Sequence, residues 1–143
     1  MNKVRATGAD YPVLLSIWEE SVKATHAFLK NDDFDALREE IPSFFPSLEI
    51  YFWEAEREII GFTGHAVKRL EMFFLSPRFR GKGYGTAILQ ELIEKEGIFF
   101  VDVNLQNGAA RKFYEKNGFR VHATSEKDGQ GRPYPILHLK LVK

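Results

Sequence analysis

Arg80-Gly81-Lys82-Gly83-Tyr84-Gly85 lies between a strand-like segment, residues 70–76, and a helix-like segment, residues 86–96. Glycines let the backbone turn tightly and bring its N–H groups close to an anion. The positive end of the helix that follows favours negative charge at the same place. The stretch therefore predicts a strand, a pyrophosphate-binding turn and a helix in direct succession.

Two common phosphate-binding motifs do not fit this turn. A P-loop ends in Gly-Lys-Ser/Thr, and no such string occurs in the chain. The dinucleotide-binding fingerprint G-x-G-x-x-G follows a first strand, whereas these glycines stand at positions 81, 83 and 85 in mid-chain. A glycine-rich surface turn without a ligand is the alternative interpretation.

A second segment, residues 104–119, reads Asn-Leu-Gln-Asn-Gly-Ala-Ala-Arg-Lys-Phe-Tyr-Glu-Lys-Asn-Gly-Phe. Asn107 is a good helix N-cap, and Asn117-Gly118 is the left-handed stop expected before a new strand. Ala109, Ala110 and Phe113 mark one helix face. Tyr114 lies at the edge of that face, where the plain alternative is a half-buried tyrosine filling a gap between helix and sheet.

Together the two segments resemble the GCN5-related N-acetyltransferase (GNAT) superfamily. Arg80-x-x-Gly83-x-Gly85 is similar to its Q/R-x-x-G-x-G/A signature, and residues 107–119 are similar to its N-x-x-A-x-x-F-Y-x-x-x-G-F segment. The resemblance involves specific residues over 70–119, about a third of the chain. Elsewhere only the expected order of strands and helices is similar. It implies an acetyltransferase that uses acetyl-CoA.

Composition bounds the size of the protein and the kind of partner. The chain has 143 residues, of which 44% are hydrophobic, so we expect one domain over residues 1–143. Net charge is zero, which disfavours nucleic acid and anionic membranes as partners. Without cysteine, disulfides, thiolate metal sites and thiol nucleophiles are excluded. No segment suits a membrane span or signal peptide, so we expect a soluble cytoplasmic protein, monomeric or homodimeric.

The remaining sequence predicts alternating strands and helices. A helix should start at Asp10 with Pro12 just inside it, and Pro42 should end the second helix in an aromatic loop. Residues 98–103 are almost continuously apolar, as in a strand covered on both faces. The expected strands are residues 3–7, 49–54, 58–66, 70–76, 98–103, 119–125 and 137–141, and the expected helices include 31–41 and 84–96. This order fits an α/β fold of the GNAT type, with a mixed central sheet of about seven strands flanked by about four helices.

The resemblance implies a role for each matching residue. In similar enzymes the strand before the turn splays from its neighbour, and its free backbone groups bind the pantetheine arm; here those groups belong to Phe73 and Leu75. Arg78 lies near enough to add charge. The full set expected to bind acetyl-CoA is Phe73, Phe74, Leu75, Arg80, Gly81, Lys82, Gly83, Tyr84, Gly85, Thr86, Asn104, Asn107 and Tyr114.

The reaction implied is direct transfer of the acetyl group to an amine. Glu71 interrupts an apolar strand and is the candidate general base, with His26 or a water molecule as alternatives and a plain surface glutamate as the bland interpretation. Tyr114 stands at the position of the family's general acid. We recognise no serine or histidine arrangement that would support a covalent acyl-enzyme.

The acceptor pocket is expected between the first two helices and the last hairpin. Trp18, His26, Phe28 and Tyr134 are its candidate residues, and this aromatic set favours a compact amine or a peptide N-terminus over a long lysine side chain. Residues 25–29 and the Tyr134-Pro135 hairpin resemble a small bacterial subgroup of these acetyltransferases. His65, His122 and His138 are expected to face solvent, and no metal is implied.

Two other function classes fit the same motifs. A non-catalytic acyl-CoA sensor would keep the turn, although Tyr114 and Glu71 together favour an enzyme. An interaction domain would keep the turn only for folding. The sequence leaves the acceptor and the preferred acyl chain open.

Overall fold

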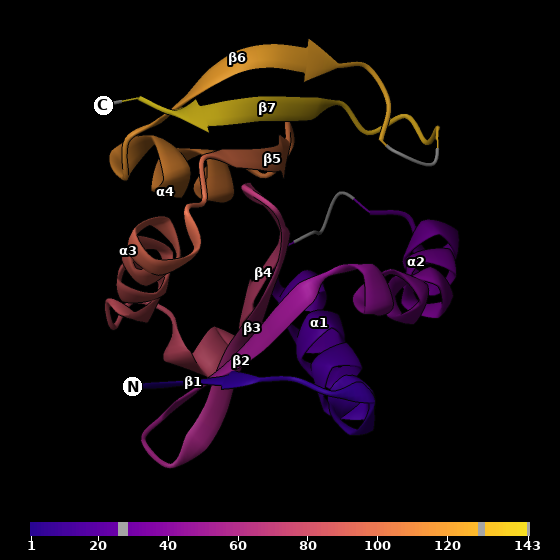
Figure 1. The fold of residues 1–143 in the computed structure, drawn as a ribbon. Helices are drawn as coiled ribbons and strands as arrows, with labels where there is room; N and C mark the ends of the chain where they lie inside the picture. Colours follow the sequence, from indigo (N-terminus) through magenta and orange to yellow (C-terminus); the bar gives the residue numbers. More distant parts are fainter. Residues whose placement is uncertain (26–28, 129–130, 143) are drawn as a thin grey trace.

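The computed structural model contains one mixed sheet with the strand order β1-β2-β3-β4-β5-β7-β6 (Figure 1). It describes residues 1–25, 29–128 and 131–142. The strands are β1 (Asn2–Arg5), β2 (Glu49–Ala55), β3 (Glu58–Ala66), β4 (Arg69–Leu75), β5 (Phe100–Asn104), β6 (Phe119–Ser125) and β7 (Ile136–Leu141). The α-helices are α1 (Tyr11–Thr25), α2 (Asn31–Phe44), α3 (Tyr84–Glu96) and α4 (Gly108–Lys116). The predicted α/β fold is confirmed.

Each face of the sheet carries one hydrophobic core and one pair of helices (Figure 1). On one face α3 and α4 bury Leu89 and Leu92 against β4, β5 and β7. On the other face α1 and α2 bury Leu14 and Phe45 against β2, β3 and β4. The sheet thus separates two cores, each covered by its own pair of helices.

The strands β4 and β5 diverge soon after they begin to pair. They are parallel, unlike the other neighbouring strands, and their register includes only Arg69↔Phe100 and Leu70↔Val101. Beyond these pairs the edge of β4 has no ladder partner on this side. Unpaired backbone groups need other partners, and an extended peptide-like ligand can supply them. The splay implied by the sequence resemblance is therefore present.

Glu71 occupies a β-bulge at the point where β4 leaves β5. Opposite β3, Leu70 pairs with His65 and Met72 pairs with the adjacent Gly64, so Glu71 is the extra residue. A bulge of this kind bends the strand and redirects a side chain. Here it turns β4 away from β5 and places a carboxylate at the opening.

Two expectations about secondary-structure elements were wrong. Pro42 does not end α2, which continues to Phe44, because burial of Ile41 and Phe45 in the core outweighs one lost N–H bond in the last turn. The strand at residues 98–103 begins only at Phe100 and alternates in exposure, so only one of its faces is covered by the core.

His65 does not face solvent, contrary to the expectation. Its side chain is 3% exposed, and its Nε2 atom lies 3.3 Å from Glu49 Oε2 and 3.7 Å from Glu96 Oε1. The Tyr51 ring stacks against it from the neighbouring strand, with the ring centroids 6.2 Å apart. The end of α3 and the side chains of β2 therefore cover this part of β3.

Candidate active site

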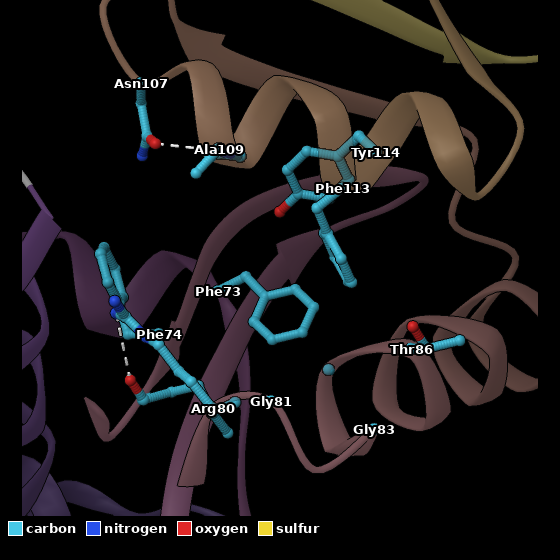
Figure 2. A pocket seen from close by; sticks show the side chains of 13 residues that line it. Phe73, Phe74, Arg80, Gly81, Gly83, Thr86, Asn107, Ala109, Phe113 and Tyr114 are labelled. Carbon is cyan, nitrogen blue, oxygen red and sulfur yellow. Dashed lines mark hydrogen bonds between the residues drawn. The ribbon is translucent and has the colours of Figure 1, made fainter. Parts of the chain in front are cut away.

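A cavity of about 410 Å³ lies between β4, the glycine turn and α4 (Figure 2). It opens where β4 and β5 diverge. Aromatic and aliphatic side chains form most of its wall, with a few polar groups at the two ends. Its lining residues are Phe73, Phe74, Leu75, Arg80, Gly81, Gly83, Gly85, Thr86, Asn107, Ala109, Ala110, Phe113 and Tyr114.

The glycine turn leaves the N-terminus of α3 open. Gly81 and Gly83 have φ angles of 75° and 83°, in a backbone region that residues other than glycine rarely adopt. Gly83 is also the N-cap of α3. A Cβ atom built on either glycine would meet nothing within 4 Å, so the space over both residues is free. The first N–H groups of α3 and its positive dipole end therefore face room for an anion.

The basic residues near the turn differ in their surroundings. Lys82 Nζ forms an ion pair with Glu56 at 3.1 Å, and Arg78 forms one with Glu58 at 2.6 Å, so the hairpin between β2 and β3 holds both cations. Arg80 lines the cavity and reaches the Leu75 carbonyl at 3.4 Å. Arg80 is thus the cation best placed beside the turn.

Two residues predicted to bind the cofactor point elsewhere. Lys82 and Tyr84 do not line the cavity, and the Tyr84 hydroxyl donates a hydrogen bond of 2.7 Å to Glu56. The Leu75 carbonyl is not free either, because the Ser21 hydroxyl of α1 donates to it at 2.8 Å. Ser76 N donates to Ile60 O and Phe74 pairs with Phe62 in the same register, so the Phe74 backbone groups face β3 and the strand edge left for a ligand centres on Phe73.

Tyr114 projects from α4 into the cavity. Figure 2 shows its phenol oxygen directed into the space between α4 and β4. Only 7% of the residue is exposed, and its ring packs edge-on against Phe113 and Phe119. Burial raises the pKa of the phenol well above its ordinary value, because the anion would lose its solvation. Tyr114 therefore holds its proton at neutral pH.

Two asparagines organise the backbone at the upper end of the cavity. Asn107 caps α4, its Oδ1 atom accepting a hydrogen bond of 3.1 Å from Ala110 N, as the sequence predicts. Asn104 Oδ1 accepts one of 2.9 Å from Gln106 N at the end of β5. Both line a second, smaller cavity of about 120 Å³ that shares Phe73, Phe74, Asn107, Ala110 and Tyr114 with the first.

Glu71 lines this second cavity together with Asp102, a residue that the sequence analysis did not single out. Burial raises the pKa of the Glu71 carboxyl, the Asp102 charge raises it further, and Arg69 opposes both. The Arg69 side chain lies 3.9 Å from Glu71 and 2.9 Å from Asp102. A single acidic residue in an apolar strand was the signal that could have identified Asp102.

Trp18 and Tyr134, two of the residues predicted for the acceptor pocket, line neither cavity. Trp18 is 2% exposed and stacks on Phe34 with 5.3 Å between ring centroids, so it belongs to the core under α1 and α2. The Tyr134 hydroxyl donates to Asp33 of α2 and fastens the last hairpin to that helix. His26 and Phe28 lie outside the described residues.

A serine, a histidine and an aspartate are hydrogen-bonded in series on the outer face of β6, β7 and β5. His138 lies 2.7 Å from Ser125 through Nε2 and 2.7 Å from Asp102 through Nδ1. The sequence analysis did not recognise this arrangement, and His138 is partly exposed on the outer face, as expected. Only strand pairing brings these three residues together, because they come from three separate segments.

Comparison with known proteins identifies the family. The sequence model of the acetyltransferase (GNAT) domain family matches residues 46–121, which include the glycine turn and Tyr114. The chain belongs to the GNAT family. Its enzyme class is therefore that of the acetyltransferases, as predicted.

Individual relatives agree with this assignment. The peptidyl-lysine N-acetyltransferase YjaB of Salmonella typhimurium is 35% identical over 127 residues, 88% of each chain. The solution structure of apo-form YjaB from Escherichia coli matches with a TM-score of 0.90 and 32% identity over 99% of this chain and 97% of that one. The bacterial subgroup resembled by residues 25–29 and the Tyr134-Pro135 hairpin is that of YjaB.

A solved complex shares the fold. The N-acetyltransferase PaiA of Thermoplasma acidophilum, in complex with coenzyme A, matches with a TM-score of 0.68 and 23% identity over 98% of this chain and 99% of that one.

None of the helices in the described part of the chain is both long and apolar enough to cross a bilayer.

Proposed function

We propose that the chain transfers the acetyl group of acetyl-CoA to a primary amine, with the donor bound in the larger cavity. The observation that carries this proposal is the divergence of β4 and β5 over a cavity that has a free glycine turn at one end and a buried phenol at the other. These features fit the two ends of the donor. The turn suits a pyrophosphate, and the phenol suits a thioester.

The turn would hold the pyrophosphate through its backbone. The N–H groups of residues 81–86 lie at the start of α3, where partial positive charge gathers, and Arg80 adds a full charge beside them. The free edge of β4 at Phe73 would pair with the amide groups of the pantetheine arm. Apolar walls from Phe74 and Phe113 would exclude water around that arm.

Acetyl-CoA supplies an activated acetyl group as a thioester, and residues of the chain would move the protons. An alkylamine of pKa ~10.4 is neutral in only about one molecule in 2,500 at pH 7, a handicap of roughly 4.6 kcal/mol. Glu71 would remove this proton, because it lines the smaller cavity, which shares part of its wall with the larger one. A strand N–H near Phe73 would stabilise the developing oxyanion.

Tyr114 would return a proton to the leaving thiolate. Its raised pKa makes the phenol a weaker acid than a solvated tyrosine, but a thiolate formed in the same apolar surroundings is also poorly solvated and correspondingly more basic. The two effects offset each other, so proton transfer from the phenol to the thiolate is not opposed by the burial of Tyr114. Burial thus keeps the proton on Tyr114 until the thiolate forms.

We propose a lysine side chain of a protein as the acceptor. The YjaB relative is named for peptidyl-lysine, and the Glu71 and Asp102 carboxylates outnumber the Arg69 guanidinium at the smaller cavity, which suits a cationic amine. This choice replaces the preference for a compact amine or a peptide N-terminus. That preference depended on Trp18, His26, Phe28 and Tyr134. Trp18 and Tyr134 line neither cavity, and His26 and Phe28 lie outside the described residues.

A thiol-release assay with matched peptides tests the proposal. One peptide carries a single lysine and a blocked N-terminus; its partner has a free N-terminus and no lysine. We expect thiol release with acetyl-CoA and the first peptide, and far less with the second. Faster release with the second peptide would contradict the lysine assignment, and propionyl-CoA in parallel would report the acyl preference.

The same assay separates an enzyme from a sensor. A sensor would gain stability from acetyl-CoA without turning it over, by about 2.7 kcal/mol at a hundredfold excess over the dissociation constant. Stabilisation of this size with no thiol release from any amine would favour the sensor. No stabilisation at all would favour an interaction domain.

A further inference from the structure

The hydrogen-bonded series Ser125–His138–Asp102 has an internal order of donors and acceptors. A carboxylate has no proton to give, so the bond between Asp102 and His138 needs a proton on Nδ1. In the neutral ring Nε2 is then an acceptor, and the Ser125 hydroxyl donates to it. The series therefore draws the serine proton toward a histidine whose other nitrogen faces a negative charge.

The surroundings hold this geometry in place. Asp102 Oδ1 also accepts a hydrogen bond of 2.9 Å from Arg69, so the carboxylate is fixed from two sides. Asp102 and His138 are directly opposed across the β5–β7 ladder. Ser125 and Ile136 form the last pair of β6 with β7, next to Asn104 at the end of β5. The three side chains thus stand on three hydrogen-bonded strands of the sheet.

The serine is also within reach of a small molecule. Ser125 is partly exposed, and the His138 and Asp102 side chains are 25% and 32% exposed. All three project away from the core that the neighbouring Leu137, Leu139 and Val103 enter. A nucleophile, a base hydrogen-bonded to it, and an acid orienting the base are the parts that activate serine in unrelated enzymes.

We propose that Ser125 is a base-activated nucleophile that accepts an acyl group from small activated esters. In the step, Ser125 Oγ bonds to the acyl carbon while the ester C–O bond breaks. His138 Nε2 takes the hydroxyl proton, Asp102 stabilises the resulting imidazolium, and the proton then passes to the departing alcohol. Water can later cleave the serine ester. This reaction needs neither coenzyme A nor Tyr114, although Asp102 also lines the smaller cavity proposed for the amine.

The test uses the whole protein with 4-nitrophenyl acetate and no coenzyme A. We expect a burst of nitrophenolate, a mass gain of one acetyl group, and its location on Ser125 by peptide mass spectrometry. Ser125→Ala should lose the burst. His138→Gln should slow acylation by ~100-fold or more, the usual contribution of a general base.

His122→Gln is the matched control, because this histidine lies on β6 beside Phe100 and its side chain makes no hydrogen bond within the described part of the chain. It should label Ser125 at the original rate. Acetyl groups found only on lysines, equally in Ser125→Ala, would overturn the proposal. Labelling of Ser125 at an unchanged rate in His138→Gln would overturn it too, provided that thermal unfolding shows each variant to be folded.

Discussion

Replacing Tyr114 with phenylalanine should slow catalysis without disturbing the protein. The substitution removes one oxygen from a ring that keeps its contacts with Phe113 and Phe119. The phenol is the proton donor in the proposed reaction, and a positioned acid typically contributes about 100-fold to 10,000-fold. This range corresponds to about 2.7–5.4 kcal/mol of transition-state stabilisation at 1.36 kcal/mol per decade. We expect kcat to fall within it.

The assay is thiol release at saturating acetyl-CoA and lysine peptide, with the coenzyme A dissociation constant measured separately by calorimetry. The dissociation constant should stay within about twofold, because the groups proposed to hold the pyrophosphate are untouched. Tyr84→Phe is the matched control, since its hydroxyl bonds Glu56 outside the cavity. An unchanged kcat in Tyr114→Phe, or an equal loss in Tyr84→Phe, would refute the acid role of Tyr114.

Three further predictions concern the turn, the base and the sheet. Gly83→Val should lower the free energy of unfolding by about 1–2 kcal/mol, because position 83 has a positive φ angle, and it should also weaken coenzyme A binding. Gly97→Val, with a φ of 70° at the other end of α3, should lose similar stability and leave binding intact. Equal affinities of the two variants by calorimetry would count against the turn as the binding site. The raised pKa of Glu71 means that the carboxyl stays protonated to a higher pH than usual, so the pH profile of kcat/KM should show an inflection at that pKa. Glu71→Gln should remove this inflection, and an unchanged inflection would exclude Glu71 as the base. Gly61→Ala should destabilise the fold by about 1–3 kcal/mol in urea unfolding, because its Cβ atom would come 2.3 Å from a β4 carbonyl oxygen, whereas Gly108→Ala meets nothing within 4 Å and should be nearly neutral; similar costs for both would refute the packing argument.

The parts of the structure that sequence predicted well are those set by local chemistry. The turn and α3 follow from glycines that need positive φ angles and from apolar residues at helical spacing. The start of α4 follows from the Asn107 cap, and its end follows from Gly118, whose φ is 96°. Each of these signals lies within a few residues of the feature it produces, so no tertiary contact was needed to interpret it.

The parts that sequence missed depend on strand pairing. The bulge at Glu71 exists only relative to β3, and it decides where that carboxylate points. Asp102 and His138 become neighbours because β7 inserts between β5 and β6, an order that the sequence of elements does not dictate. Trp18 looked like a pocket residue because aromatic side chains suit both ligands and cores, and packing against Phe34 placed it in the core.

The most direct test of the central claim is an amide NMR titration of the protein with coenzyme A. The account predicts that the largest shifts fall on the backbone amides of residues 81–86, with a smaller one at Phe73 on the open edge of β4. Saturable binding that leaves the amides of residues 81–86 unchanged would contradict it.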